Sequence, residues 1–181
     1  MAEERSIEDL VDDALYGAIA VPGWDDEFED VRSRINLVCV ASPDLGFRSL
    51  DETGLRDLLH FAFEKDRSLE TINLKEELAA WQGDQRVRWL DEITPLNWMI
   101  GKKAYPIRYS PETDPREGVA YSPSVVVPAD QLDDVDYHPF VCEGRVTVRI
   151  VLTDRQGRRL GETLDWPVYR SETGTGATRR S

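Results

Sequence analysis

The sequence contains little of what most enzyme sites are built from. It has two cysteines and two histidines among 181 residues. It contains no Gly-rich phosphate loop, no nucleophile elbow and no His-Glu-x-x-His pattern. These absences exclude the common signatures of nucleotide binding, serine hydrolysis and zinc proteolysis. We therefore predict a protein that is not an enzyme, with no catalytic residues and no cofactor.

The few metal-ligating side chains are also poorly spaced. Cys39, His60, His138 and Cys142 are enough in number for one tetrahedral zinc site. His138 and Cys142 have a tolerable ligand spacing, but Cys39 and His60 are distant from them and from each other along the chain. We predict ordinary packed side chains, no bound metal, and free thiols rather than a disulfide, as in a reducing compartment.

Lysine is scarce in this chain. With four lysines, arginine supplies most of the 22 basic residues, which face 35 aspartates and glutamates. The net charge is -13 and the pI about 4.6. Acidic, lysine-poor and arginine-rich surfaces suit molar salt, so we hypothesise a halophilic source, with an ordinary acidic surface as the alternative. The Debye length is then about 3 Å, and the charge says little about partners except that nucleic acid is not expected.

Long hydrophobic runs are also missing. No segment is apolar over the length that a bilayer requires, and no signal peptide opens the chain. We expect a soluble protein, made in the cytoplasm, without a membrane partner. Its length suits one domain with elaborations.

Helical spacing is clear near the N-terminus. Ser6 followed by Asp9 predicts a capping box, and apolar residues then recur at helical spacing as far as Ile19. This amphipathic helix is expected to pack on its own domain or, alternatively, in a groove of a neighbouring subunit. A short acidic helix follows over 25–34, so residues 1–34 form an N-terminal helix and linker.

Strand and helix signals alternate in the next segment. Ile35–Ala41 is almost continuously apolar, as in a strand buried on both faces. The stretch from Gly54 predicts two helices, the second capped by Ser68 and ended by Gly83. Val87–Leu90 is then predicted as a strand.

Proline interrupts the region from about 94 to 140. Repeated proline favours short edge strands, which are predicted at Tyr105–Tyr109 and Ser124–Val127. A family resemblance, given below with its motifs, implies that this region is an insertion that makes a new interface or lengthens an old one. The nearby tryptophans (Trp81, Trp89 and Trp98) are interpreted as core residues.

The clearest β signal is the C-terminal hairpin. Alternating apolar residues predict its first strand: Val146, Val148, Ile150 and Leu152. A turn is predicted over 154–157, and the return strand over Leu164–Val168. Residues 171–181 have a composition typical of disorder and are predicted as an extended tail.

These patterns predict an α+β fold. We expect two to four short helices packed on a small mixed or antiparallel sheet, with the Pro-rich insertion before the C-terminal hairpin. The domain organisation follows as residues 1–34, an α+β domain over 35–170, and a tail over 171–181.

Three motifs in the middle of the chain resemble those of a known family. Ile35–Pro43 resembles an "I-x-x-I-L-x-T-x-P-G-E" segment, Gly54–Phe61 a "G-x-x-L-x-x-L-L-F" helix, and Trp81 with Asp84–Val87 a "W-E-P-R-V" corner. The family is the small wedge protein of contractile-tail baseplates in phages, tailocins and type VI secretion machines. This chain departs from it where Gln85 replaces the proline, and Asp44-Leu45 stands in place of Gly-Glu.

The resemblance implies a structural subunit of a virion or contractile injection system, here of an archaeal host if the source is halophilic. It would join the tail baseplate after assembly in the host cytoplasm, with other wedge proteins and sheath subunits as partners. By resemblance, Asp84 and Arg86, beside Trp81, contact the larger wedge proteins. Sheath arms would add as strands to a hairpin edge whose candidate residues are Val146, Val148, Ile150, Leu164 and Trp166.

Other interpretations remain open. Arg86 has a purely local alternative, an ion pair with Asp84 or Glu77. The whole chain has two alternatives: another virion component, such as a tail terminator or head–tail connector, or a small halophilic ligand-binding protein with a pocket around the tryptophans.

Overall fold

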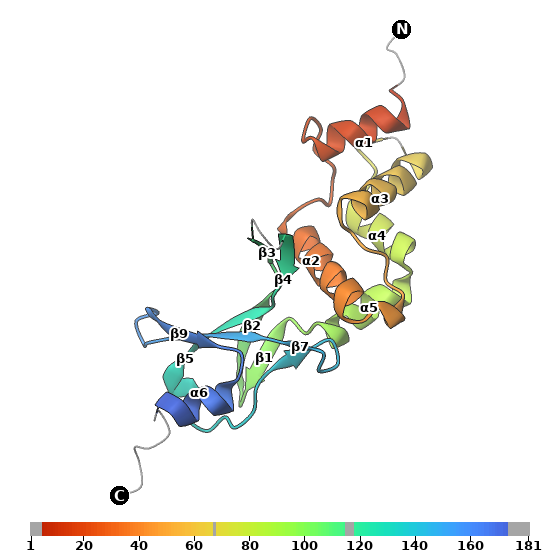
Figure 1. Ribbon diagram of the computed structural model, residues 1–181. Coiled ribbons are helices and arrows are strands. Elements are labelled where there is room, and N and C mark those ends of the chain that lie inside the picture. Colours follow the sequence, from red (N-terminus) through yellow and green to blue (C-terminus); the bar gives the residue numbers. More distant parts are fainter. Residues whose placement is uncertain (1–4, 67, 115–117, 174–181) are drawn as a thin grey trace, which may run out of the picture. The chain divides into compact units, whose positions relative to one another are not determined.

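The computed structural model describes residues 5–66, 68–114 and 118–173 and consists of two compact units, Met1–Leu90 and Asp91–Ser181 (Figure 1). The fold is α+β, as predicted, with six α-helices and a mixed five-stranded sheet in the described residues. The boundary between the units falls inside residues 35–170, which the sequence pattern assigns to one domain. Each unit is therefore described by itself.

Unit 1 is helical. Its elements are α1 (Ile7–Leu15), α2 (Asp26–Ala41), the 3-10 turn η1 (Pro43–Leu45), α3 (Glu52–Lys65), α4 (Leu74–Gln82) and α5 (Asp84–Ile93), of which the last three residues belong to unit 2. Polar side chains accept a hydrogen bond from a first-turn N–H at the start of α1 to α4: Ser6, Asp25, Asp51 and Asn73. These caps satisfy N–H groups that the helix itself leaves unpaired.

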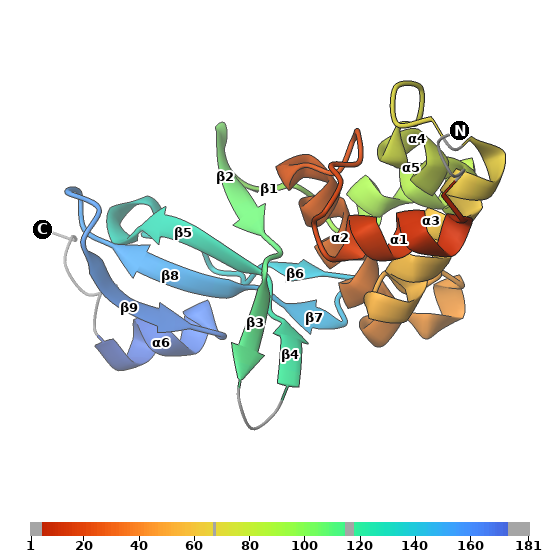
Figure 2. The same cartoon turned by 90° about the horizontal axis from the view of Figure 1, so that it is seen from above.

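Helix α1 has the predicted capping box. Ser6 Oγ accepts from the N–H of Asp9 at 3.1 Å, and the Asp9 carboxylate accepts from the N–H of Ser6 at 3.2 Å. The apolar face of α1 lies along α3 (Figures 1 and 2), and Arg56 of α3 pairs with Asp12 at 2.6 Å. The prediction that this helix packs on its own domain is confirmed, although it ends at Leu15, before Ile19.

The strand predicted over Ile35–Ala41 is wrong, because these residues form the second half of α2. The helix begins at the predicted acidic segment and continues through the apolar run. Ile35, Leu37 and Val38 are all buried. An apolar run that is buried on several sides does not distinguish a helix from a strand by its period.

The two helices predicted after Gly54 are confirmed as α3 and α4. The second begins at Leu74 with Asn73 as its cap, not with Ser68, and ends at Gly83, whose φ is 94°. The strand predicted over Val87–Leu90 is wrong, since these residues lie in α5. Two signals favour the helix over a strand here: an acidic residue in the first turn, Asp84, and buried apolar residues three positions apart, Leu90 and Ile93. They prevail over the strand preference of the β-branched and aromatic residues in this segment.

Unit 2 is built around a sheet with the strand order β1-β2-β5-β8-β9. Its strands are β1 (Asn97–Ile100), β2 (Lys103–Arg108), β5 (Ser124–Pro128), β8 (Arg149–Thr153) and β9 (Arg159–Thr163). Strands β5 and β8 are parallel, and the other neighbours are antiparallel (Figure 2). The strands predicted at Tyr105–Tyr109 and Ser124–Val127 are confirmed as β2 and β5, so the Pro-rich region supplies three of the five strands.

One face of this sheet forms the core of unit 2. Ile107, Val125 and Ile150 lie opposite one another across β2, β5 and β8, and all three are buried. Helix α6 (Trp166–Thr173) covers this face. A Cβ at Gly161 would lie 2.9 Å from the Tyr169 hydroxyl, so glycine permits the close approach of α6 to β9.

Smaller elements complete unit 2. They are the hairpin of β3 (Pro111–Asp114) and β4 (Gly118–Tyr121), the pair β6 (Phe140–Val141) and β7 (Val146–Thr147), and the 3-10 turn η2 (Ala129–Gln131).

The return strand predicted over Leu164–Val168 is wrong. The turn at 154–157 is in place, but the strand that follows it is β9, and Trp166 begins α6. Pro167 fixes φ at a helical value and lacks an N–H, which suits the first turn of a helix. Asp165 Oδ1 accepts from the N–H of Val168 at 3.1 Å, as a helix cap does.

The tail predicted over 171–181 overlaps the end of α6, which runs to Thr173. Its remaining residues, 174–181, lie outside the described residues.

Candidate partner-binding surfaces

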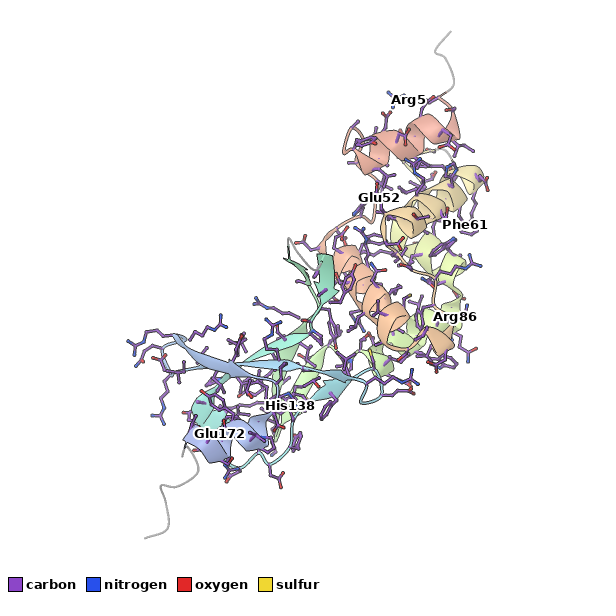
Figure 3. The ribbon with its side chains drawn as sticks, viewed as in Figure 1. Arg5, Glu52, Phe61, Arg86, His138 and Glu172 are labelled. Carbon is purple, nitrogen blue, oxygen red and sulfur yellow. The ribbon has the colours of Figure 1, made fainter. Side chains whose placement is uncertain are left out.

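The first candidate surface is the corner between α4 and α5, where the sequence predicts partner contacts. Asp84 begins α5 and is exposed. Arg86 folds back across the corner, and its Nη1 donates to the carbonyl oxygen of Gln82 at 2.8 Å (Figure 3). Its Nη2 lies 3.5 Å from where a Cβ would stand at Gly46. Arg86 therefore satisfies a carbonyl at the C-terminal end of α4.

An open hollow of ≈ 420 Å³ lies at this corner. It is lined by Leu45, Gly83, Asp84, Gln85, Arg86 and Trp89. Trp89 is 41% exposed. The hollow thus combines a carboxylate, a guanidinium and an indole, which suits a side chain of a partner. Glu77, the local alternative for Arg86, is bound by Lys65 Nζ at 2.8 Å.

Trp81 belongs to the core rather than to this surface. It is 8% exposed, and the Arg48 guanidinium lies 5.2 Å above its ring. The adjacent Gln82 accepts from the N–H of Arg48 at 3.0 Å and donates to its carbonyl oxygen at 2.5 Å. Trp81 and Gln82 hold the segment before α3, and we expect Trp81 to affect a partner only through the fold.

The hairpin residues predicted to bind a partner do not form one continuous sheet edge. Ile150 lies in β8, which is paired on both sides, so that β1 and β9 are the edges of this sheet. Val148 and Trp166 are buried, and Val146 is half-buried beside Val141 in the β6–β7 pair. Two of the predicted residues remain at an edge: Val146, because β7 pairs with β6 alone, and Leu164, which follows β9 and is 61% exposed.

Exposed apolar side chains gather in unit 2. Of the eleven large ones exposed in the described residues, eight belong to it: Leu96, Met99, Val126, Tyr137, Phe140, Leu160, Leu164 and Val168. Several lie on the sheet face opposite the core, which we call the open face. It consists of the exposed and half-buried positions that alternate with the core residues, namely Asn97, Met99, Ala104, Pro106, Arg108, Ser124, Val126, Pro128, Arg149, Val151, Leu160 and Glu162.

The sequence pattern separates the two faces of the sheet in β8 but not in β5. The predicted alternation in β8 places Ile150 and Leu152 on one side and Arg149 and Val151 on the other, as in the structure. Val125 to Val127 are apolar at every position, and only the structure separates inward from outward residues in β5. Arg108 at the end of β2 and Arg149 at the start of β8 are the signal that one face meets water.

Burial shifts the pKa of both cysteines and of His138. Burial raises the pKa of the Cys39 and Cys142 thiols to about 11, so both stay protonated at neutral pH, and both are free. Burial lowers the pKa of His138. Among the described residues, no three His, Cys, Asp or Glu side chains cluster in a way that would hold a metal ion, and none of the described helices is long and apolar enough to cross a membrane.

The fold has relatives among solved structures. Two crystal structures of Escherichia coli HrpB, described as a DExH-box NTPase and as a DEAH/RHA helicase, match with TM-scores of 0.70 and 0.67 at 18% identity. The matches cover 97% and 99% of this chain and 23% of each HrpB chain, so this chain spans under a quarter of the protein that it resembles. No family model matches the chain, and no curated protein matches it by sequence.

Proposed function

We propose that this chain is a non-catalytic binding module that works with a DExH-box NTPase of the same cell. The observation that carries the proposal is the likeness to HrpB, which extends over both units of the chain. A shared fold does not transfer an activity. The role that we assign, binding rather than hydrolysis, comes from the residues of this chain.

Those residues suit contact with protein. The sequence contains no Gly-rich phosphate loop. Its net charge of -13 opposes direct contact with a phosphate backbone, which proteins bind through clustered Lys and Arg. The hollow at Arg86 and the open face of unit 2 offer aromatic and apolar groups beside arginines, the residue types that contribute most at protein interfaces.

The proposal is tested with purified proteins. The chain is mixed with the DExH-box NTPase of its own organism, and the complex is sought by size-exclusion chromatography and calorimetry. ATP hydrolysis is then measured with and without the chain. We expect co-elution, a changed hydrolysis rate, and no binding to an unrelated NTPase as control. Absence of association at about 50 µM of each protein, which excludes a micromolar Kd, would refute the proposal.

A second candidate is a structural subunit of a contractile-tail baseplate, located in the virion or injection machine. The three motif resemblances favour it, and so does the position of β9 at an edge of the sheet. We expect β9, rather than the residues first predicted, to accept an extended sheath arm as an added strand. An unpaired edge strand without such a partner is an aggregation hazard.

Arg86→Ala tests this second candidate. Truncating Arg86 removes its hydrogen bond to the carbonyl oxygen of Gln82, at a cost of about 1 kcal/mol in stability. The variant should therefore remain a folded, soluble monomer. We expect that it no longer enters baseplates. Arg88→Ala, an exposed arginine two residues on, is the control. Circular dichroism reports folding, and co-purification with sheath and tube proteins reports assembly. Normal particles containing the Arg86→Ala chain would contradict the baseplate assignment.

A further inference from the structure

We propose that the open face of unit 2 docks an acidic amphipathic helix of a partner protein. The proposed function thereby gains a binding surface and the type of segment that the surface binds. This docking rests on the proposed function only for the identity of the protein that carries the helix. Four features of the described residues carry it: an apolar centre, arginines in register beside it, a paired acidic edge, and a saturated backbone.

The centre of the open face is apolar and accessible. Val126 of β5 lies directly opposite Val151 of β8, and Met99 of β1 opposite Ala104 of β2. Val126 is 44%, Met99 51% and Leu160 59% exposed. Single exposed apolar residues are ordinary, but a group of them on one sheet face is typical of an interaction site.

Two arginines border this apolar centre. Arg108 of β2 and Arg149 of β8 are both register partners of Ser124, so that they lie on either side of it at one end of the face. Glu162 is the one acidic side chain among the open-face positions defined above, and Arg159 binds it at 2.5 Å. Basic side chains therefore outnumber acidic ones at the open-face positions, although unit 2 as a whole carries 12 basic and 14 acidic residues. An acidic segment is the complement of such a face.

The backbone of the sheet favours a helix as the occupant. The interior strands β2, β5 and β8 have neighbours on both sides, so their N–H and C=O groups are used within the sheet. A segment lying across the face finds no backbone partners and must satisfy its own, which a helix does. Five strands about 4.8 Å apart span about 19 Å, the length of a helix of about 13 residues.

The test uses two substitutions on the open face and two matched controls elsewhere in unit 2. Val126→Glu and Arg108→Glu place an acid in the apolar centre and reverse a bordering charge. Val168→Glu, on α6 at 48% exposure, and Arg155→Glu, in the β8–β9 turn, make the same changes off the face. All four side chains are exposed, so we expect each variant to fold. Circular dichroism checks this expectation.

The probe is a synthetic helix of about 14 residues with leucines on one side and glutamates on the other, labelled for fluorescence anisotropy. A counterpart with lysines in place of the glutamates controls for charge. We expect the wild-type chain to bind the glutamate helix at least about tenfold tighter than the lysine helix. Val126→Glu and Arg108→Glu should each weaken it about tenfold, and the controls should stay within about twofold.

Several results would overturn the inference. These are no binding of the glutamate helix, equal binding of both helices, equal affinities for all variants, or competition by single-stranded RNA. A dimer in sedimentation that Val126→Glu abolishes would show instead that a second copy of the chain occupies the face.

The same variants separate this inference from the proposed function. If the DExH-box NTPase binds Val126→Glu and Arg108→Glu as tightly as the wild type, the inference fails and the proposed function stands. If the NTPase does not bind but the glutamate helix discriminates the variants as expected, the proposed function fails and the inference stands.

Discussion

The two units of this chain present different surfaces to water. Residues 1–90 contain 10 Lys and Arg against 21 Asp and Glu, a net charge of -11, whereas residues 91–181 contain 12 against 14, a net charge of -2. Exposed large apolar side chains are distributed in the opposite way, with three in unit 1 and eight in unit 2 among the described residues. Unit 1 thus presents the more strongly acidic surface, and unit 2 exposes more of its large apolar side chains.

The difference follows from how each unit makes its core. In unit 1, the apolar sides of the helices face one another, as α1 and α3 do, and their acidic sides face water. In unit 2, α6 and the segment before β6 cover one side of a sheet, and β5 and β8 are apolar on both sides. The other side of the sheet exposes Met99, Val126 and Leu160 to water.

The largest effect is expected from Trp166→Ala in unit 2. Trp166 is 2% exposed, and its Nε1 donates to the carbonyl oxygen of Val135 at 2.9 Å. Its removal creates a cavity between α6 and the sheet and should lower the free energy of unfolding of unit 2 by about 3–5 kcal/mol. Calorimetry checks this, with Trp89→Ala, exposed in unit 1, as the control.

If the units are independent, Trp166→Ala shifts one calorimetric transition and leaves the other in place. A single transition that moves as a whole would show that the two units unfold together. The two units would then differ in their surfaces but not in their stability.

A smaller effect is expected from Gly54→Ala in unit 1. A Cβ at Gly54 would lie 1.8 Å from the carbonyl oxygen of Ser49, so the backbone itself must move. The N–H of Gly54 also donates to Asp51 at 2.9 Å as part of the α3 cap. We expect a loss of about 1–3 kcal/mol in urea unfolding, whereas Thr53→Ala, one residue earlier and exposed, changes little. An unchanged midpoint for Gly54→Ala would contradict the tight packing of this turn.

Local signals in the sequence predict part of each unit. The capping box at Ser6, the helix after Gly54 and the positive φ of Gly83 depend on neighbours within a few residues, and all three are confirmed. The strand predicted at Ile35–Ala41 is wrong because helix α2 buries its apolar run on more than one side, which only tertiary packing decides.

The candidate surfaces were harder to predict than the elements. Ile150 was taken as an edge residue because β8 and its return strand form a hairpin, but the parallel neighbour β5 comes from more than twenty positions earlier in the chain. No periodicity within β8 reveals that pairing. The open face depends on the same non-local contact, since Val126 and Val151 meet only across the β5–β8 pair.

The smallest effect is expected from the titration of His138, which joins α6 to the rest of unit 2 (Figure 3). Its Nδ1 accepts from the N–H of Trp166 at 3.0 Å, and its Nε2 lies 2.7 Å from the carbonyl oxygen of Val148. A backbone N–H only donates and a carbonyl only accepts, so the ring is neutral with its proton on Nε2. A second proton on Nδ1 would break the bond to α6.

The direction of the pH effect follows from this geometry. Burial lowers the pKa of His138 in the folded state, while the Val148 carbonyl and Asp165 act in the opposite direction. As the pH falls below about 6.5, the unfolded chain takes up a proton that the folded chain excludes, so unit 2 loses stability. The loss stops once the pH is below the folded-state pKa, because both states are then protonated.

Urea unfolding from about pH 7.5 to about pH 5 measures this effect, with His138→Gln as the matched variant. Glutamine has one donor and one acceptor group for the same two backbone atoms, yet it does not titrate. The wild type should lose stability relative to His138→Gln as the pH falls. Parallel pH profiles would show that His138 is protonated in the folded chain without cost, and that α6 is held to the sheet by Trp166 and its apolar contacts alone.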